Sequence, residues 1–124
     1  MVDDTIGRKW ALIIGINNYI DSNITPLQYA VNDAYALYEC LTDNEYGCFE
    51  ASKTKLLTDK TEIKPTRSEI LKAINGLQIA EVKDSVFIFF AGHGIEKNGE
   101  SYLVKELTRG IGFSTGVRVD LVVS

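Results

Sequence analysis

The only histidine of the chain, His93, stands between two glycines in the stretch AGHG at residues 91–94. It directly follows the apolar run Val86–Phe90, which is typical of a strand buried on both faces. Open α/β sheets carry their functional side chains at the carboxyl ends of the strands. An imidazole exchanges protons near neutral pH, and the glycines leave room for a substrate backbone. His93 is therefore the first candidate for a catalytic acid or base, the alternative being a structural histidine in an apolar setting.

A catalytic histidine needs a partner, and the two thiols of the chain fit that role poorly. Cys40 and Cys48 both precede His93. Cys40 falls beside Leu37 and Leu41 in a helical pattern, so we expect it in the core, where free cysteine behaves as a small hydrophobe. Cys48 lies in a glycine loop with no basic neighbour in sequence to favour its thiolate. The sequence thus offers a proton-transfer residue without an evident nucleophile.

Composition and charge restrict the classes of protein to which the chain could belong. With 124 residues and 45% hydrophobic content, it is long enough for one core. The net charge of -4, with dispersed lysines, argues against nucleic acid as a partner. Residues 1–5 lack a leader pattern, and no apolar run approaches the roughly 20 residues of a membrane span. We expect a cytoplasmic protein with no membrane partner.

Two cysteines in unlike settings do not form a disulfide framework or a zinc set. We therefore assign no metal and no cofactor. The stretch GINN at residues 15–18 follows an apolar run but lacks the glycine spacing of a phosphate-binding turn, so nucleotide binding has little support.

The pattern along the chain predicts strands that alternate with helices. Residues 10–16 form a continuous apolar run and are expected to be the first, central strand. Residues 25–28 (TPLQ) combine a capping threonine, a proline and a glutamine, which predicts the start of a helix. Its apolar face recurs every three or four residues, at Leu27, Ala30, Val31, Ala34, Leu37, Tyr38 and Leu41.

The second half repeats this alternation. Lys55–Leu57 is a shorter strand candidate. Thr66 and Glu69 form a capping box, which predicts a helix whose apolar face holds Ile70, Leu71, Ile74 and Leu77. Asn98-Gly99 predicts a hairpin that would add another strand to the sheet. The fold class is α/β, a three-layer α/β/α sandwich with a mainly parallel sheet.

The C-terminal segment is strand-like as well. Residues 116–124 alternate between apolar and polar types and then become fully apolar. We divide the chain into a main domain at 1–104 and a divergent C-terminal segment at 105–124. An apolar terminal strand tends to pair with another chain, so self-association through it is expected.

Taken together, these stretches resemble the caspase-like cysteine peptidases of family C14, especially their metacaspase-type and bacterial members. The resemblance runs from Lys9 to Val104 and rests on the order and spacing of four pieces. They are ALIIGIN at residues 11–17, LQYAVNDA at 27–34, LTD at 57–59 with PT at 65–66, and FFAGHG at 89–94.

The resemblance implies a cysteine endopeptidase acting on protein or peptide substrates. His93 takes the place of the histidine that handles the protons of the nucleophile and the leaving group. Gly94 takes the position whose backbone N–H helps to hold the oxyanion. Asp33 matches the acidic residue that lines the pocket for a basic P1 side chain in metacaspase-type members. The alternative for Asp33 is a solvated carboxylate near a helix start.

The chain departs from the family in two ways. Ala91 stands where many relatives have a serine, and Ala30 where some have a cysteine. Relatives also continue beyond the position of Val104 to a nucleophile motif, Asp-x-Cys followed by x and Gly or Ser. In caspases that cysteine lies about 50 residues after the histidine. We therefore expect a cysteine endopeptidase domain without its nucleophile, inactive as this chain alone. The rival interpretation is a non-enzymatic caspase-like scaffold that binds or regulates a partner.

Overall fold

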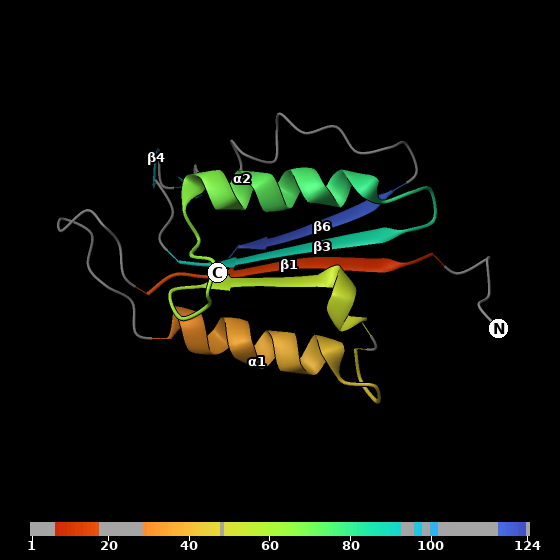
Figure 1. The fold of residues 1–124 in the computed structure, drawn as a ribbon, viewed down its shortest axis with the longest axis horizontal. Helices are drawn as coiled ribbons and strands as arrows, with labels where there is room; N and C mark the ends of the chain where they lie inside the picture. Colours follow the sequence, from red (N-terminus) through yellow and green to blue (C-terminus); the bar gives the residue numbers. More distant parts are fainter. Residues whose placement is uncertain are drawn as a thin grey trace.

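The computed structural model describes residues 7–17, 29–47, 49–92, 96–97, 100–101 and 117–123. Figure 1 shows a sheet seen nearly edge-on, with helix α1 (Ala30–Thr42) against one face and helix α2 (Arg67–Gly76) against the other. The expected three-layer α/β/α arrangement is confirmed.

The main sheet has four strands, all parallel, in the order β2-β1-β3-β6. They are β1 (Lys9–Gly15), β2 (Thr54–Thr58), β3 (Ser85–Ala91) and β6 (Arg118–Val123). β1 lies between β2 and β3, as expected for the first apolar run. The strand expected near the C-terminus is present as β6, which pairs with β3.

The core explains why the first run is apolar without interruption. Residues 11–14 of β1 are all 0% exposed, because helices cover both faces of the sheet. β3 alternates instead, with every second side chain fully packed against α2. The core cluster on the α2 side consists of Leu12, Ile14, Ile16, Leu57, Ile70, Ile74, Leu77, Ala80, Val86, Ile88 and Phe90.

α1 differs from the expected helix in its start and in the burial of Cys40. It begins at Ala30, with Tyr29 as its N-cap residue, rather than at Pro26; residues 25–28 lie outside the described part of the chain. The expected core position of Cys40 is wrong, because its side chain is exposed. The buried stripe starts at Ala30 and Ala34. Each residue turns the helix by about 100°, which carries Cys40 past the edge of that stripe.

α2 begins where the capping pattern predicted. The hydroxyl of Thr66 accepts a hydrogen bond from the backbone N–H of Glu69 at 3.2 Å. In a full capping box the Glu69 side chain would also accept a hydrogen bond from the Thr66 N–H. Here the Thr66 N–H donates to the carbonyl of Lys64 instead. Leu71, expected on the core face, is 37% exposed, whereas Ile70 is fully buried. A short 3-10 helix, η2 (Leu77–Ile79), continues α2 toward β3.

The predicted hairpin forms, but it does not extend the main sheet. β4 (Glu96–Lys97) and β5 (Glu100–Ser101) pair antiparallel as a separate two-stranded sheet. The connecting Asn98-Gly99 lies outside the described residues. The expectation of an added strand in the main sheet is therefore wrong: β6 occupies the edge beside β3 instead.

A buried carboxylate ties the amino ends of β1 and β3 together. The Asp84 side chain, 4% exposed, accepts hydrogen bonds from the Arg8 N–H at 2.8 Å, the Trp10 Nε1–H at 3.0 Å and the Glu81 N–H at 2.9 Å. Burial alone would raise the pKa of Asp84, but these bonds and the Arg8 charge outweigh it and hold the pKa below its ordinary 3.8. The carboxylate therefore stabilises the fold at neutral pH, and this contribution is lost only as the pH falls below that value.

Two glycines provide a matched test of the packing of α1 on the sheet. A Cβ at Gly15 would lie 2.6 Å from the carbonyl oxygen of Ala30 and 2.7 Å from the Cβ of Ala34. We expect Gly15→Ala to lower the free energy of unfolding by about 1–3 kcal/mol. Gly76, at the end of α2, has nothing within 4 Å of such a Cβ. Gly76→Ala should raise stability by up to about 1 kcal/mol. Equal effects in chemical denaturation would show that this close approach does not exist.

Candidate active site

The carboxyl ends of three strands meet at one edge of the sheet. In the parallel register, Gly15 at the end of β1 is level with Thr58 of β2 and with Ala91 of β3. The segments that follow these strands therefore leave the sheet side by side. This is the edge at which open α/β sheets carry their functional groups, and we call it the carboxyl edge.

Two polar residues join β1, β2 and α1 at the carboxyl edge. The Asn17 backbone N–H donates to the Asp59 carboxylate at 2.7 Å, directly beyond β2. The Asn17 side-chain oxygen accepts from the Val31 N–H at 3.0 Å, in the first turn of α1. An N–H in the first turn of a helix has no partner within the helix, so Asn17 acts as a cap from outside it. This bond accounts for the start of α1 near residue 30.

Asp33 lies in the same first turn and is exposed. Its backbone N–H donates to the carbonyl of Tyr29 at 2.8 Å. Because Asn17 holds the neighbouring Val31, the start of α1 and Asp33 stand at the carboxyl edge rather than at the opposite end of the sheet. An exposed carboxylate in this place can attract a basic side chain. Its negative charge also interacts favourably with the positive amino end of the helix dipole.

The chain leaves β3 at the same edge. The Ile16 N–H donates to the carbonyl of Ala91 at 3.0 Å, which fixes the end of β3 against β1. Gly92 follows with a φ of 156°, an angle that residues with a Cβ rarely adopt. His93 and Gly94 come next in the sequence and lie outside the described residues, so their roles remain predictions.

In the described ranges, no group of three or more His, Cys, Asp or Glu side chains is arranged to hold a metal ion. Within those same ranges, no helix is long and apolar enough to cross a membrane. A groove of the described surface lies beside β2, and none of Asn17, Asp33 or Asp59 lines it.

Sequence reasoning missed Asn17 and Asp59 as residues that organise the site. Each is a polar residue placed one or two positions after an apolar strand. In neighbouring parallel strands, that pattern predicts side chains at a common edge. The signal was present, but the partners are 42 residues apart, and only the register of β1 with β2 joins them.

Comparison with known proteins agrees with the fold. Residues 8–116 match the sequence profile of the caspase domain. This match includes β1, α1, β2, α2 and β3, together with Asp33, His93 and Gly94.

Three metacaspases are similar to this chain over most of its length. Metacaspase-7 of Arabidopsis thaliana is 36% identical over 88 residues, 69% of this chain and 21% of its own length. Metacaspase-1 of Cryptococcus neoformans is 38% identical over 92 residues, 71% of this chain and 19% of its own. Metacaspase-4 of Arabidopsis thaliana is 33% identical over 95 residues, 75% and 22% respectively. The chain thus spans about a fifth of the length of these relatives.

The link from β1 to α1 can be tested with two asparagines. Asn17→Ala removes the acceptor of the Val31 N–H, so we expect the free energy of unfolding to fall by about 0.5–2 kcal/mol, the usual cost of a lost cap. Asn32, exposed in the same turn, is the matched control, and Asn32→Ala should leave stability within about 0.5 kcal/mol. If the two variants unfold at the same denaturant concentration, Asn17 does not cap the helix.

Proposed function

The chain belongs to the caspase-like cysteine peptidases of family C14, and we propose that it is the histidine-bearing part of a metacaspase-type endopeptidase. Membership of this family supports proteolysis of protein or peptide substrates as the proposed activity. The observation that carries the proposal is the carboxyl edge: the register of β1 with β3, and the bond from Asn17 to α1, bring Asp33 and the segment that leads to His93 to one edge.

In the proposed mechanism, His93 is the acid and base of an acyl transfer. It takes the proton from a cysteine thiol as the sulfur attacks the substrate carbonyl, and it returns that proton to the leaving amine. The Gly94 N–H stabilises the oxyanion of the tetrahedral intermediate, which requires only an unobstructed amide aimed at that oxygen. Water then hydrolyses the thioester, with His93 acting as base again.

Neither cysteine of the sequence lies where the proposed mechanism needs its nucleophile. Cys40 is exposed in the last turn of α1, so it precedes His93 in the chain, and Cys48 also precedes His93. We therefore propose that this chain alone does not cleave peptides, and that a cysteine placed after His93 in a longer or second polypeptide completes the site.

Asp33 gives the proposed site a preference for arginine or lysine at P1. A carboxylate at the start of α1 would pair with a cationic side chain, and a guanidinium can bond both of its oxygens. An acidic P1 side chain would be repelled. The exposure of Asp33 supports this role, since the carboxylate is open to a ligand.

The peptidase proposal is tested by supplying the missing cysteine. Residues 1–104 are fused to the cysteine-bearing segment of a metacaspase, and the fusion is assayed with fluorogenic peptides ending in arginine, lysine or aspartate. We expect cleavage after arginine and lysine only. His93→Ala should lower the rate by about three orders of magnitude or more, because catalytic residues of this kind act as a unit. The unfused chain should give no turnover.

A second pair of variants separates specificity from catalysis. Asp33→Asn should lower kcat/KM for basic substrates by about tenfold or more. A tenfold loss corresponds to about 1.4 kcal/mol, which is within the range for a lost hydrogen bond to a charged group. Glu39→Gln, which neutralises another exposed carboxylate of α1, is the control and should change nothing. Turnover by the unfused chain, or a fusion whose activity survives His93→Ala, would contradict the proposal.

The scaffold alternative has one observation in its favour. β6 is an edge strand of the described sheet, and Val119, Leu121 and Val122 are 40%, 38% and 43% exposed. Such an edge can pair with another strand, so in this alternative the protein self-associates through β6.

Self-association can be measured directly. The chain should elute from size-exclusion chromatography as a dimer at high concentration, and Val122→Lys should return it to a monomer, because a charged side chain on an edge strand opposes pairing. A monomer at every concentration would eliminate β6 as a contact between copies.

A further inference from the structure

The outer edge of β2 is the other border of the main sheet. Two observations show which of its residues direct their backbone groups outward. The Ile16 N–H donates to Ala91 of β3, so the backbone groups of even-numbered residues of β1 point to β3 and those of odd-numbered residues point to β2. The register then directs the backbone groups of Lys55 and Leu57 toward β1. Independently, the Thr58 N–H donates to the Thr61 hydroxyl rather than to β1. Thr54, Leu56 and Thr58 therefore direct their backbone groups away from the sheet.

Most of these outward groups already have partners at the two ends of β2. The Thr54 N–H donates to the carbonyl of Ala51. The Thr58 N–H and carbonyl both bond the Thr61 hydroxyl, at 3.0 and 2.9 Å. In the described part of the chain, this leaves the N–H and carbonyl of Leu56 and the carbonyl of Thr54 facing outward at the middle of the strand. An edge of this kind is a template for a further strand.

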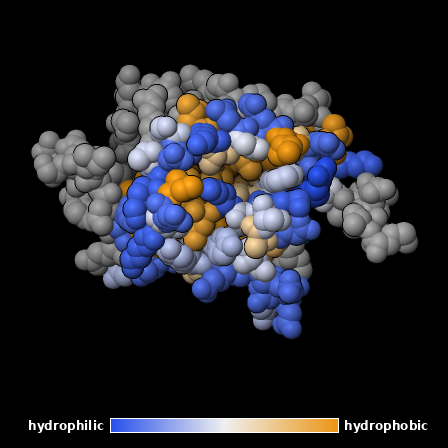
Figure 2. Space-filling model, viewed as in Figure 1, coloured by the Kyte–Doolittle hydropathy of each residue, from blue (hydrophilic) through white to orange (hydrophobic). Residues whose placement is uncertain are grey.

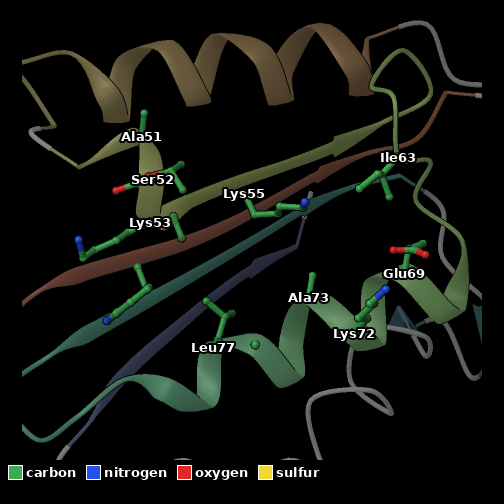
Figure 3. A pocket seen from close by; sticks show the side chains of 13 residues that line it. Ala51, Ser52, Lys53, Lys55, Ile63, Glu69, Lys72, Ala73 and Leu77 are labelled. Carbon is green, nitrogen blue, oxygen red and sulfur yellow. The ribbon is translucent and has the colours of Figure 1, made fainter.

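A groove runs beside this edge on the α2 side of the sheet, with a volume of about 450 Å³. One wall comes from β2 and the 3-10 helix η1 (Ala51–Lys53), and the other from α2 (Figure 3). Ala73 and Leu77 of α2 give it an apolar surface. Figure 2, viewed as Figure 1, shows hydrophobic residues on this side of the molecule framed by hydrophilic ones.

The charged side chains of the groove favour an acidic ligand. Three lysines line it, Lys53, Lys55 and Lys72, against one carboxylate, Glu69. Lys53 forms an ion pair with Glu50, outside the lining, and Figure 3 shows Lys72 and Glu69 projecting side by side from α2. Lys55 is exposed, extends along the groove from β2, and has no ion pair among the described residues. A chain of net charge -4 thus carries an excess of positive charge here.

We propose that the β2 edge binds an extended, acidic polypeptide segment as an added strand, with a carboxylate opposite Lys55. Backbone bonds to Leu56 and Thr54 supply the strand pairing, and side chains supply the selectivity. Residues directly opposite each other on adjacent strands point to the same face of the sheet, so the residue beside Lys55 points to the α2 side, as Lys55 does. Residues two positions away share that face and meet the apolar lining.

The geometry defines a probe peptide. Acetyl-TVTETVT-amide places a glutamate at its centre with valines two positions to either side. Added to the full isotope-labelled chain, it should shift the amide resonance of Leu56 in a saturable way and slow the exchange of that amide with solvent. No saturable shift at Leu56 would overturn the proposal.

Charge reversal tests the contact with Lys55. Lys55→Glu should weaken binding by about fivefold to tenfold, as expected when an attractive cross-strand pair becomes a repulsive one. Lys60→Glu changes the charge equally in the turn after β2, outside the groove, and should alter affinity by less than about twofold. Both lysines are exposed, so each variant is expected to fold, and thermal melting is the check. Equal weakening by both would show attraction to net charge alone and would overturn the proposal.

Two altered peptides separate strand addition from side-chain docking. A lysine in place of the glutamate should weaken binding at least as strongly as Lys55→Glu. N-methylation of the three central residues keeps every side chain but removes their backbone donors, so binding should fall at least fivefold. An N-methylated peptide that binds as well as the parent would overturn strand addition. None of these measurements involves peptidase activity, so their outcome is independent of the proposed function.

Discussion

The rest of the structure depends on β1 being enclosed on all sides. It pairs with β2 along one edge and with β3 along the other, and residues 11–14 are fully buried because helices cover both faces. These buried positions leave no room for a polar side chain, and the strand fixes the register of both neighbours. The Asp84 carboxylate secures its amino end through Arg8 and Trp10. At its carboxyl end, Gly15 lets α1 approach closely.

This register turns three separate stretches of sequence into one edge. Asn17 follows β1, Asp59 follows β2 and Gly92 follows β3. Asn17 donates a hydrogen bond to Asp59 and accepts one from the Val31 N–H, which joins the segment after β2 to the start of α1. The sheet thereby separates two tasks. Its carboxyl edge carries Asn17, Asp33 and Asp59, whereas the groove along the outer side of β2 is built from different residues and is proposed to bind a different kind of ligand.

The sequence predicted the parallel α/β sandwich because its strongest signals were long apolar runs and the Thr66 cap, which are decided locally. It failed where tertiary contacts decide. Asn17, distant in sequence from α1, sets the start of that helix near Ala30, which no local capping pattern could show. Cys40 carried a helical spacing but fell outside the buried stripe. The prediction that residues around Asn98-Gly99 form a hairpin was correct, but the prediction that it extends the main sheet was wrong, since turn chemistry does not specify which sheet edge a hairpin joins.

The central proposal is that His93 transfers protons at the carboxyl edge while Asp33 binds a basic side chain. Since His93 is the only histidine, its ring resonances in the full chain can be followed without ambiguity. The account predicts that the ring exchanges protons with solvent between pH 5 and 8 and that its resonances shift when an arginine-containing peptide amide is added. The Asp33→Asn variant and an aspartate-containing peptide should both abolish that shift. A ring that neither titrates in this range nor responds to the arginine peptide would contradict the account.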